Sequence, residues 1–104
     1  HGVRLTGDPR AAASGADALY TDVWVSMGDE EEAARRRADL APFRLDGDLL
    51  AAAKDGAVVL HCLPAHPGEE IAADVLYSDA SAVWDQAENR LHAQKALLEA
   101  LLAG

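Results

Sequence analysis

Two runs of apolar residues predict the strands of this chain. Residues 18–25 are rich in β-branched and aromatic side chains, and residues 57–60 form a short continuous apolar run, as in strands buried in parallel sheets. Residues 3–5 and 82–84 are weaker strand candidates. Polar segments with helix signals separate these runs, so the pattern predicts strands that alternate with helices.

Five segments outside the strands carry helix signals. Asp8 before Pro9 marks a helix start, Asp46 is a predicted N-cap, and Asp85 with Glu88 forms a capping box. In the segment 29–37 the acidic residues 29–32 come first and the arginines 35–37 come last, an order that complements the helix dipole. The predicted helices are 9–15, 29–37, 46–54, 69–77 and 85–102.

This alternation predicts an α/β fold, with a partial doubly wound parallel sheet flanked by helices and a long helix at the C-terminal end. No repeat, low-complexity stretch or linker is visible, so we expect residues 1–104 to form a single partial domain. The last predicted helix carries one apolar stripe with two further leucines that widen it. These residues are Ala87, Leu91, Leu98 and Leu102, with Leu97 and Leu101 beside them.

Composition and charge exclude several classes of function. The net charge of −9 disfavours binding to nucleic acid or to an anionic membrane surface, and no apolar run is long enough to span a membrane. One cysteine cannot form an internal disulfide, so we expect an intracellular, cytoplasmic protein. The only methionine is Met27 and no signal peptide is visible, so we expect this chain to be the C-terminal piece of a longer protein.

Two polar clusters follow the two main strands. Asp22 and the Ser-Met-Gly sequence at 26–28 follow the first, and residues 61–66, His-Cys-Leu-Pro-Ala-His, follow the second. Ligands of open parallel sheets bind beyond the carboxyl ends of the strands. If these strands are neighbours, both clusters line one crevice.

The first cluster suits an α-amino acid. The Asp22 carboxylate can hold an ammonium group, and Ser26, Met27 and Gly28 offer a hydroxyl and backbone N–H groups to a carboxylate. The alternative is an ordinary strand–turn–helix connection in which Asp22 or Ser26 is only a cap.

The second cluster leaves more readings open. Cys62 could be a nucleophile, a hydrogen-bond donor to substrate, a metal ligand or a small buried apolar residue. A zinc site needs about four ligands, whereas His61, Cys62 and His66 are three at most and neighbouring strand residues point to opposite faces. Arg90, on the last helix, suits a phosphate or carboxylate, or else a surface ion pair.

Three segments together resemble ornithine carbamoyltransferases. They are 21–28, 61–64 and 87–90, which read Thr-Asp-Val-Trp-Val-Ser-Met-Gly, His-Cys-Leu-Pro and Ala-Glu-Asn-Arg. The likeness covers residues 16–98. It implies transfer of the carbamoyl group of carbamoyl phosphate to L-ornithine, which gives citrulline and phosphate, without a metal or organic cofactor.

The resemblance also implies roles for particular residues. Asp22, Ser26 and Met27 would bind ornithine. Cys62, at the catalytic position, and the Leu63 carbonyl would meet the carbamoyl group and the reacting amine. Arg90 would help to hold carbamoyl phosphate.

The chain departs from the family pattern in ways that matter. The Ser-Thr-Arg-Thr phosphate loop, the His-Pro-x-Gln motif and an upstream asparagine are absent, and Pro67 stands where many relatives have arginine. The resemblance therefore implies the last third of the enzyme, which needs an N-terminal carbamoyl-phosphate domain as partner and assembles as a trimer or larger homo-oligomer. The alternatives are a carbamoyltransferase for another amine such as putrescine, or a non-catalytic α/β module whose leucine stripe binds a partner.

Overall fold

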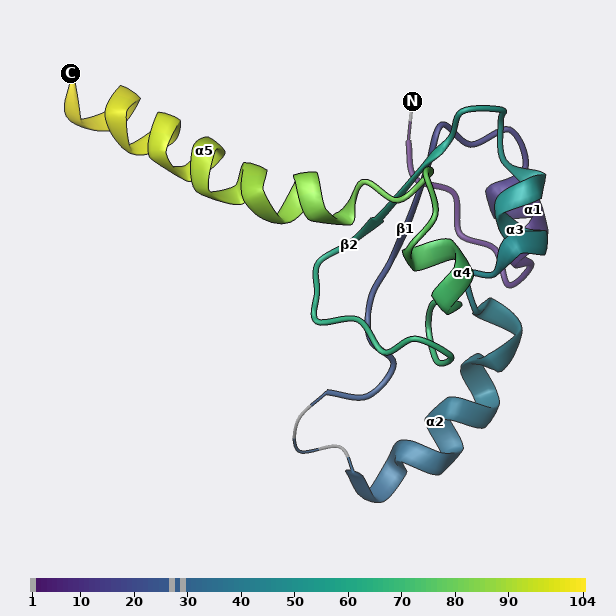
Figure 1. Ribbon diagram of the computed structural model, residues 1–104. Helices are drawn as coiled ribbons and strands as arrows, with labels where there is room; N and C mark the ends of the chain where they lie inside the picture. Colours follow the sequence, from purple (N-terminus) through teal and green to yellow (C-terminus); the bar gives the residue numbers. More distant parts are fainter. Residues whose placement is uncertain (1, 27, 29) are drawn as a thin grey trace.

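The computed structural model describes residues 2–26, 28 and 30–104, so the predicted site residue Met27 lies outside the described residues. The elements in chain order are α1 (Pro9–Ala13), β1 (Ala18–Thr21), η1 (Glu30–Glu32), α2 (Ala33–Leu40), η2 (Ala41–Phe43), α3 (Gly47–Ala52), β2 (Val58–His61), α4 (Ala73–Leu76) and α5 (Val83–Leu102). The two strands are parallel, and α5 ends the chain as a long arm that leaves the body (Figure 1). This confirms the predicted α/β class.

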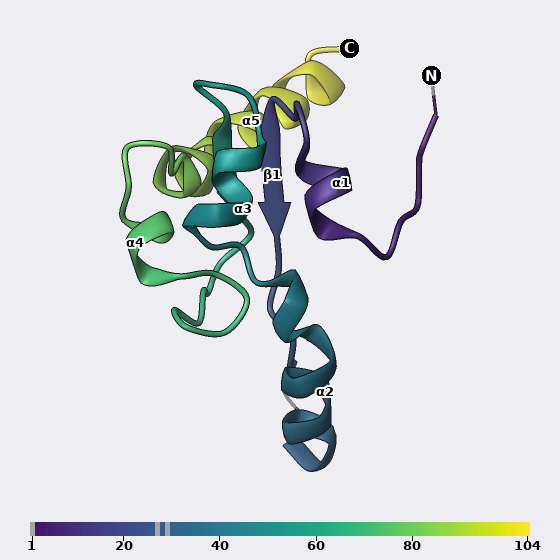
Figure 2. The same cartoon turned by 90° about the vertical axis from the view of Figure 1, so that its right-hand side faces the viewer.

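The sheet consists of two strands in the described part of the chain, paired from Ala18 with Val58 to Thr21 with His61. Helices α1 and α3 lie side by side next to β1 (Figure 2). The core gathers under β2 from apolar residues of several elements. Its buried members are Leu45, Val59, Ile71, Val75, Leu76 and Val83.

The predicted caps of the short helices are confirmed. The Asp8 carboxylate accepts the backbone N–H groups of Arg10 and Ala11, and Asp46 accepts that of Leu49 at 2.9 Å. Gly15 follows α1 with a φ of 69°, which glycine adopts without strain. Helix α3 ends at Ala52, before the predicted Lys54.

Several predicted boundaries are wrong. Residues 3–5 are not a strand, because no described segment pairs with them. The strand predicted over 18–25 ends at Thr21, where the ladder with β2 ends, and β2 itself runs one residue later than predicted, to His61. The helix predicted over 69–77 covers only Ala73–Leu76, because residues 68–72 form a turn and bridges instead.

The strand predicted over 82–84 is also wrong. Val59 donates to Ala80 and accepts from the N–H of Ala82, which makes a single bridge beside β2. The chain then turns directly into α5, whose N-cap is Ala82, so Asp85 lies in the first turn and forms no capping box. The bridge fixes Val83 in the core, where it is fully buried.

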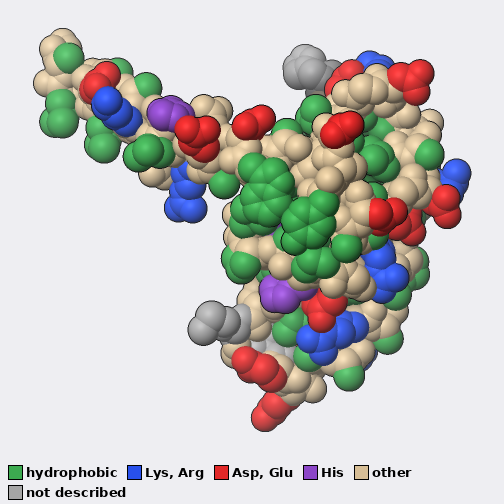
Figure 3. All heavy atoms as spheres, in the orientation of Figure 1, with side chains coloured by type: hydrophobic (Ala, Val, Ile, Leu, Met, Phe, Trp, Pro, Cys, Tyr) green, Lys and Arg blue, Asp and Glu red, His purple; other side chains and the backbone are tan. Residues whose placement is uncertain are grey.

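The apolar stripe of helix α5 is exposed to solvent. Its leucines are between 58% and 84% exposed, and Figure 3 shows hydrophobic side chains along the projecting arm. A groove on this helix, lined by Leu91, Leu98 and Leu102 among others, is therefore an open apolar surface. Among the described residues, no helix is both long enough and apolar enough to cross a membrane.

Candidate functional site

The two predicted clusters meet at the carboxyl edge of the sheet. Thr21 and His61 form the last pair of the ladder, so Asp22 and Cys62 follow side by side. The Cys62 thiol donates to Asp22 Oδ1, with 3.0 Å between the sulfur and the oxygen, and the N–H of Val23 donates to the same oxygen at 2.7 Å. Residues that lie 40 positions apart thus form one contact at the place where parallel sheets bind ligands.

The contact shifts both titrations. The pKa of Cys62 is raised, first because its thiol donates to Asp22 and then because of partial burial and the nearby negative charge. The pKa of Asp22 is lowered, first by the hydrogen bond from Cys62 and then by the backbone N–H of Val23. At neutral pH the pair is therefore a protonated thiol beside a carboxylate, which disfavours a thiolate nucleophile and favours a donor that can orient a bound group.

The contact with Asp22 predicts that the Cys62 thiol reacts slowly with alkylating reagents. Replacing Asp22 with Asn removes the negative charge, so the pKa of Cys62 falls and its reaction with iodoacetamide at pH 7 accelerates about tenfold, the equivalent of one pKa unit. Because the folded-state pKa of Cys62 is raised, its contribution to stability is present below about pH 8.5 and is lost as pH rises through the folded value. An unchanged alkylation rate in Asp22→Asn would contradict the contact.

His61 is buried and turned away from Cys62. Its Nδ1 accepts the N–H of Leu63 at 2.8 Å, so the ring proton must lie on Nε2, which donates to Glu70 Oε1 at 2.8 Å. The same Glu70 oxygen accepts the N–H of His66 at 2.7 Å. Glu70 is completely buried, and through these two hydrogen bonds it holds both ends of the 61–66 loop.

Helix α5 is tied to the same strand ends by one side chain. Gln86 accepts the N–H of His61 at 3.0 Å and donates to the hydroxyl of Tyr20 at 3.0 Å. This contact crosses from β2 to β1 and fixes the first turn of α5 against the sheet. The segments that carry Asp22 and Cys62 therefore begin at strand ends that Gln86 holds in place.

Within the described part of the chain, no hydrogen bond or ion pair joins Ser26 or Arg90 to Asp22 or Cys62. Ser26 is exposed, and the N–H of Gly28 donates to Glu30 Oε1 at 3.2 Å. The pKa of Glu30 is lowered by the backbone N–H groups that its carboxylate accepts, its own first and that of Gly28 second. Arg90 is exposed on α5 and makes no hydrogen bond or ion pair with a residue that the structure describes.

The donor groups of residues 2–26, 28 and 30–104 do not support a metal site. His61 and Cys62 face different partners, Glu70 and Asp22, so they do not form a zinc set with His66. The side chains of His66, Glu69 and Glu70 do approach within 4.8 Å of one another. The Glu69 carboxylate, however, is already held by Arg37 Nε at 2.8 Å, and that positive charge opposes a cation.

Sequence reasoning missed Glu70 and Gln86. Nothing in the local pattern marks Glu70 as buried, because it follows Gly68 and Glu69 in a polar turn. The available signal was His61: the alternation of side chains along a strand places it on the opposite face from Cys62, where a buried imidazole needs partners.

Comparison with known proteins shows the family of this chain. Residues 1–101 match the model of the Asp/Orn binding domain of aspartate/ornithine carbamoyltransferases. The chain is 62% identical over 101 residues to an ornithine carbamoyltransferase of Methanospirillum hungatei, covering 97% of this chain and 33% of the relative. It is 64% identical over 100 residues to one from Acidothermus cellulolyticus, covering 96% and 32%.

Solved structures of ornithine carbamoyltransferases also resemble this chain. The ornithine carbamoyltransferase of Pyrococcus furiosus superposes with a TM-score of 0.82 at 56% identity, over 88% of this chain and 29% of that one. The chain thus matches the Asp/Orn binding domain of carbamoyltransferases. It belongs to the aspartate/ornithine carbamoyltransferase family, and it spans about a third of the length of the curated ornithine carbamoyltransferases that it matches.

Proposed function

We propose that this chain supplies the ornithine side of an ornithine carbamoyltransferase, as one partial domain of a longer cytoplasmic enzyme. The observation that carries the proposal is the contact between Asp22 and Cys62, which unites the two family segments in one site. The family relatives are ornithine carbamoyltransferases at up to 64% identity.

In the proposed reaction, the neutral side-chain amine of ornithine attacks the carbamoyl carbon. A C–N bond forms, the C–O bond to phosphate breaks, phosphate leaves with the electron pair, and the amine loses one proton, which the departing phosphate takes up. Asp22, Ser26 and Met27 bind ornithine, with Asp22 taking an ammonium group. The protonated Cys62 thiol and the Leu63 carbonyl orient the carbamoyl group and the amine, and Arg90 helps to hold carbamoyl phosphate.

The physical sources of acceleration are positioning and charge. Holding two substrates in reactive geometry removes an entropic barrier that reaches about 7–11 kcal/mol in well-oriented model reactions. Donors aimed at the developing oxyanion add to this. Because Cys62 has a raised pKa and a carboxylate neighbour, it serves as an orienting donor in this scheme and forms no covalent intermediate.

Apart from Arg90, the phosphate-binding groups of the proposed enzyme, such as the Ser-Thr-Arg-Thr loop, are absent from these 104 residues. We therefore expect the purified chain alone to form no citrulline from ornithine and carbamoyl phosphate. A complete chain, which adds the remaining two thirds of the relatives' length, is expected to form it, and to prefer ornithine over putrescine because a diamine has no carboxylate to bind. A colorimetric citrulline assay of both proteins tests this. Turnover by the 104 residues alone, or no turnover of ornithine by the complete chain, would overturn the proposal.

A further inference from the structure

Arg44 connects the two segments that carry Asp22 and Cys62. It lies half-buried between η2 and α3, and its Cζ atom is 6.0 Å from the centroid of the Trp24 ring. Its Nε donates to the backbone carbonyl of Glu69 at 2.9 Å. Trp24 is buried two residues after Asp22, and Glu69 precedes Glu70, which holds the ring of His61, the residue before Cys62.

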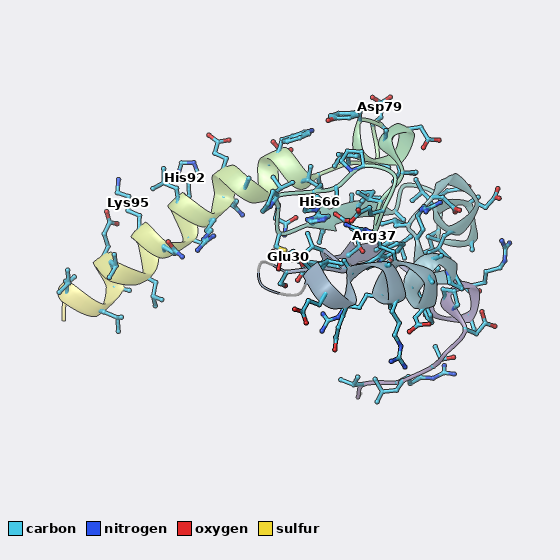
Figure 4. The ribbon with its side chains drawn as sticks, turned by 90° about the horizontal axis from the view of Figure 1, so that it is seen from below. Glu30, Arg37, His66, Asp79, His92 and Lys95 are labelled. Carbon is cyan, nitrogen blue, oxygen red and sulfur yellow. The ribbon has the colours of Figure 1, made fainter. Side chains whose placement is uncertain are left out.

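A second arginine holds the same point. Arg37, near the end of α2, forms an ion pair with Glu69 at 2.8 Å across 32 positions of sequence. Arg44 and Arg37 therefore hold Glu69 at two points, its carbonyl and its carboxylate. Both arginines lie in the part of the chain that follows residues 22–28. Figure 4 labels Arg37 and His66, and Glu69 connects these two residues: its carboxylate pairs with Arg37, and its N–H donates to the His66 carbonyl at 2.9 Å.

Backbone bonds complete this attachment. The N–H of Leu45 donates to the carbonyl of Glu70, and the N–H of Ala72 donates to the carbonyl of Leu45, both at 2.9 Å. Residue 44 is thus anchored to the turn at 69–72 by its own neighbour. The only link from this anchor back to the Asp22 segment that the described contacts show is the stack of Arg44 on Trp24.

The sheet brings Asp22 and Cys62 to the same edge, but its ladder of backbone bonds ends one residue earlier, at Thr21 and His61, and does not hold this pair itself. We propose that Arg44 is a positioning residue: by stacking on Trp24 while it holds Glu69, it fixes the Asp22 segment at hydrogen-bond distance from Cys62. Arg37 strengthens this attachment through the Glu69 carboxylate. The importance of this spacing for carbamoyl transfer rests on the proposed function, whereas the spacing itself does not.

The Cys62 thiol reports the spacing directly and needs no substrate. In Arg44→Lys the positive charge stays, but the planar face and the Nε–H are lost, so Trp24 is released and the Asp22 carboxylate withdraws. We expect the pKa of Cys62, followed by thiolate absorbance, to fall by about half a unit, and iodoacetamide labelling at pH 7 to accelerate about threefold. Arg37→Gln is expected to shift both in the same direction by less.

Arg35→Gln is the matched control for Arg37→Gln, since Arg35 also lies on α2 and carries the same charge. Among the described residues its ion-pair partner is the exposed Asp39, at 3.7 Å. Thermal unfolding followed by circular dichroism shows whether each variant is folded. If Arg44→Lys does not fold, the thiol titration of Arg37→Gln alone tests the inference. Unchanged thiol titration in the folded Arg44 and Arg37 variants would overturn the inference. So would an equal shift in Arg35→Gln. If one of these variants of the complete chain loses citrulline formation while the pKa of Cys62 is unchanged, the loss concerns the proposed function and not the spacing of Asp22 and Cys62.

Discussion

Replacing Asp22 with Asn in the complete chain is expected to lower the rate of citrulline formation about a hundredfold. The substitution keeps the size of the side chain but removes the charge that would hold an ammonium group, and a lost charge-assisted contact of about 2.7 kcal/mol has this effect on kcat/KM. The same change leaves the Cys62 thiol without its carboxylate neighbour. Steady-state kinetics with ornithine varied at saturating carbamoyl phosphate gives the measurement.

Asp39→Asn provides the control for this prediction. Asp39 lies on α2, is exposed and pairs with Arg35, so the variant makes the same chemical change away from the site. Its kcat/KM is expected to stay within about twofold of the unchanged enzyme, as surface charges contribute little. If Asp22→Asn behaves in the same way as this control, Asp22 does not bind the amine.

Replacing Glu70 with Ala is expected to cost about 3 kcal/mol of the free energy of unfolding, because one buried and one partly buried donor lose their acceptor. These are the Nε2–H of His61 and the N–H of His66, which both donate to Glu70 Oε1. The loss is a large share of the stability of a domain of this size. Urea denaturation followed by circular dichroism measures it.

Two variants sharpen the Glu70 prediction. Glu70→Gln keeps an oxygen for both donors and should lose clearly less stability than Glu70→Ala. Glu69→Ala removes the neighbouring acid, whose ion pair with Arg37 is partly exposed, and should cost less than about 1 kcal/mol. Equal losses in Glu69→Ala and Glu70→Ala would show that the buried hydrogen bonds do not stabilise the loop.

The elements that local signals determine could be predicted from the sequence. Asp8 and Asp46 bond to backbone N–H groups a few residues away, so their caps follow from local chemistry. The meeting of Asp22 and Cys62 also followed, because parallel strands bring their carboxyl ends to one edge. The family resemblance of the three segments was confirmed by the match of residues 1–101.

The remaining features depend on contacts between distant residues, which local patterns do not contain. Whether 82–84 is strand or helix is decided by the bridge of Val59 to the 80–82 segment. The burial of Glu70 depends on the position of the His61 ring, and the role of Arg44 depends on Trp24, 20 positions earlier in the sequence. The leucines of α5 were predicted as a stripe, but their exposure follows from the path of α5 away from the body.

The central claim is that Asp22 and Cys62 act as one site, and a double-mutant cycle in the complete chain tests it most directly. Citrulline formation is measured for Asp22→Asn, Cys62→Ala and the double variant. Residues that work as a unit give strongly non-additive losses. The double variant is therefore expected to be about as slow as the slower single variant, whereas losses that simply multiply, or no loss in either single variant, would contradict a shared site.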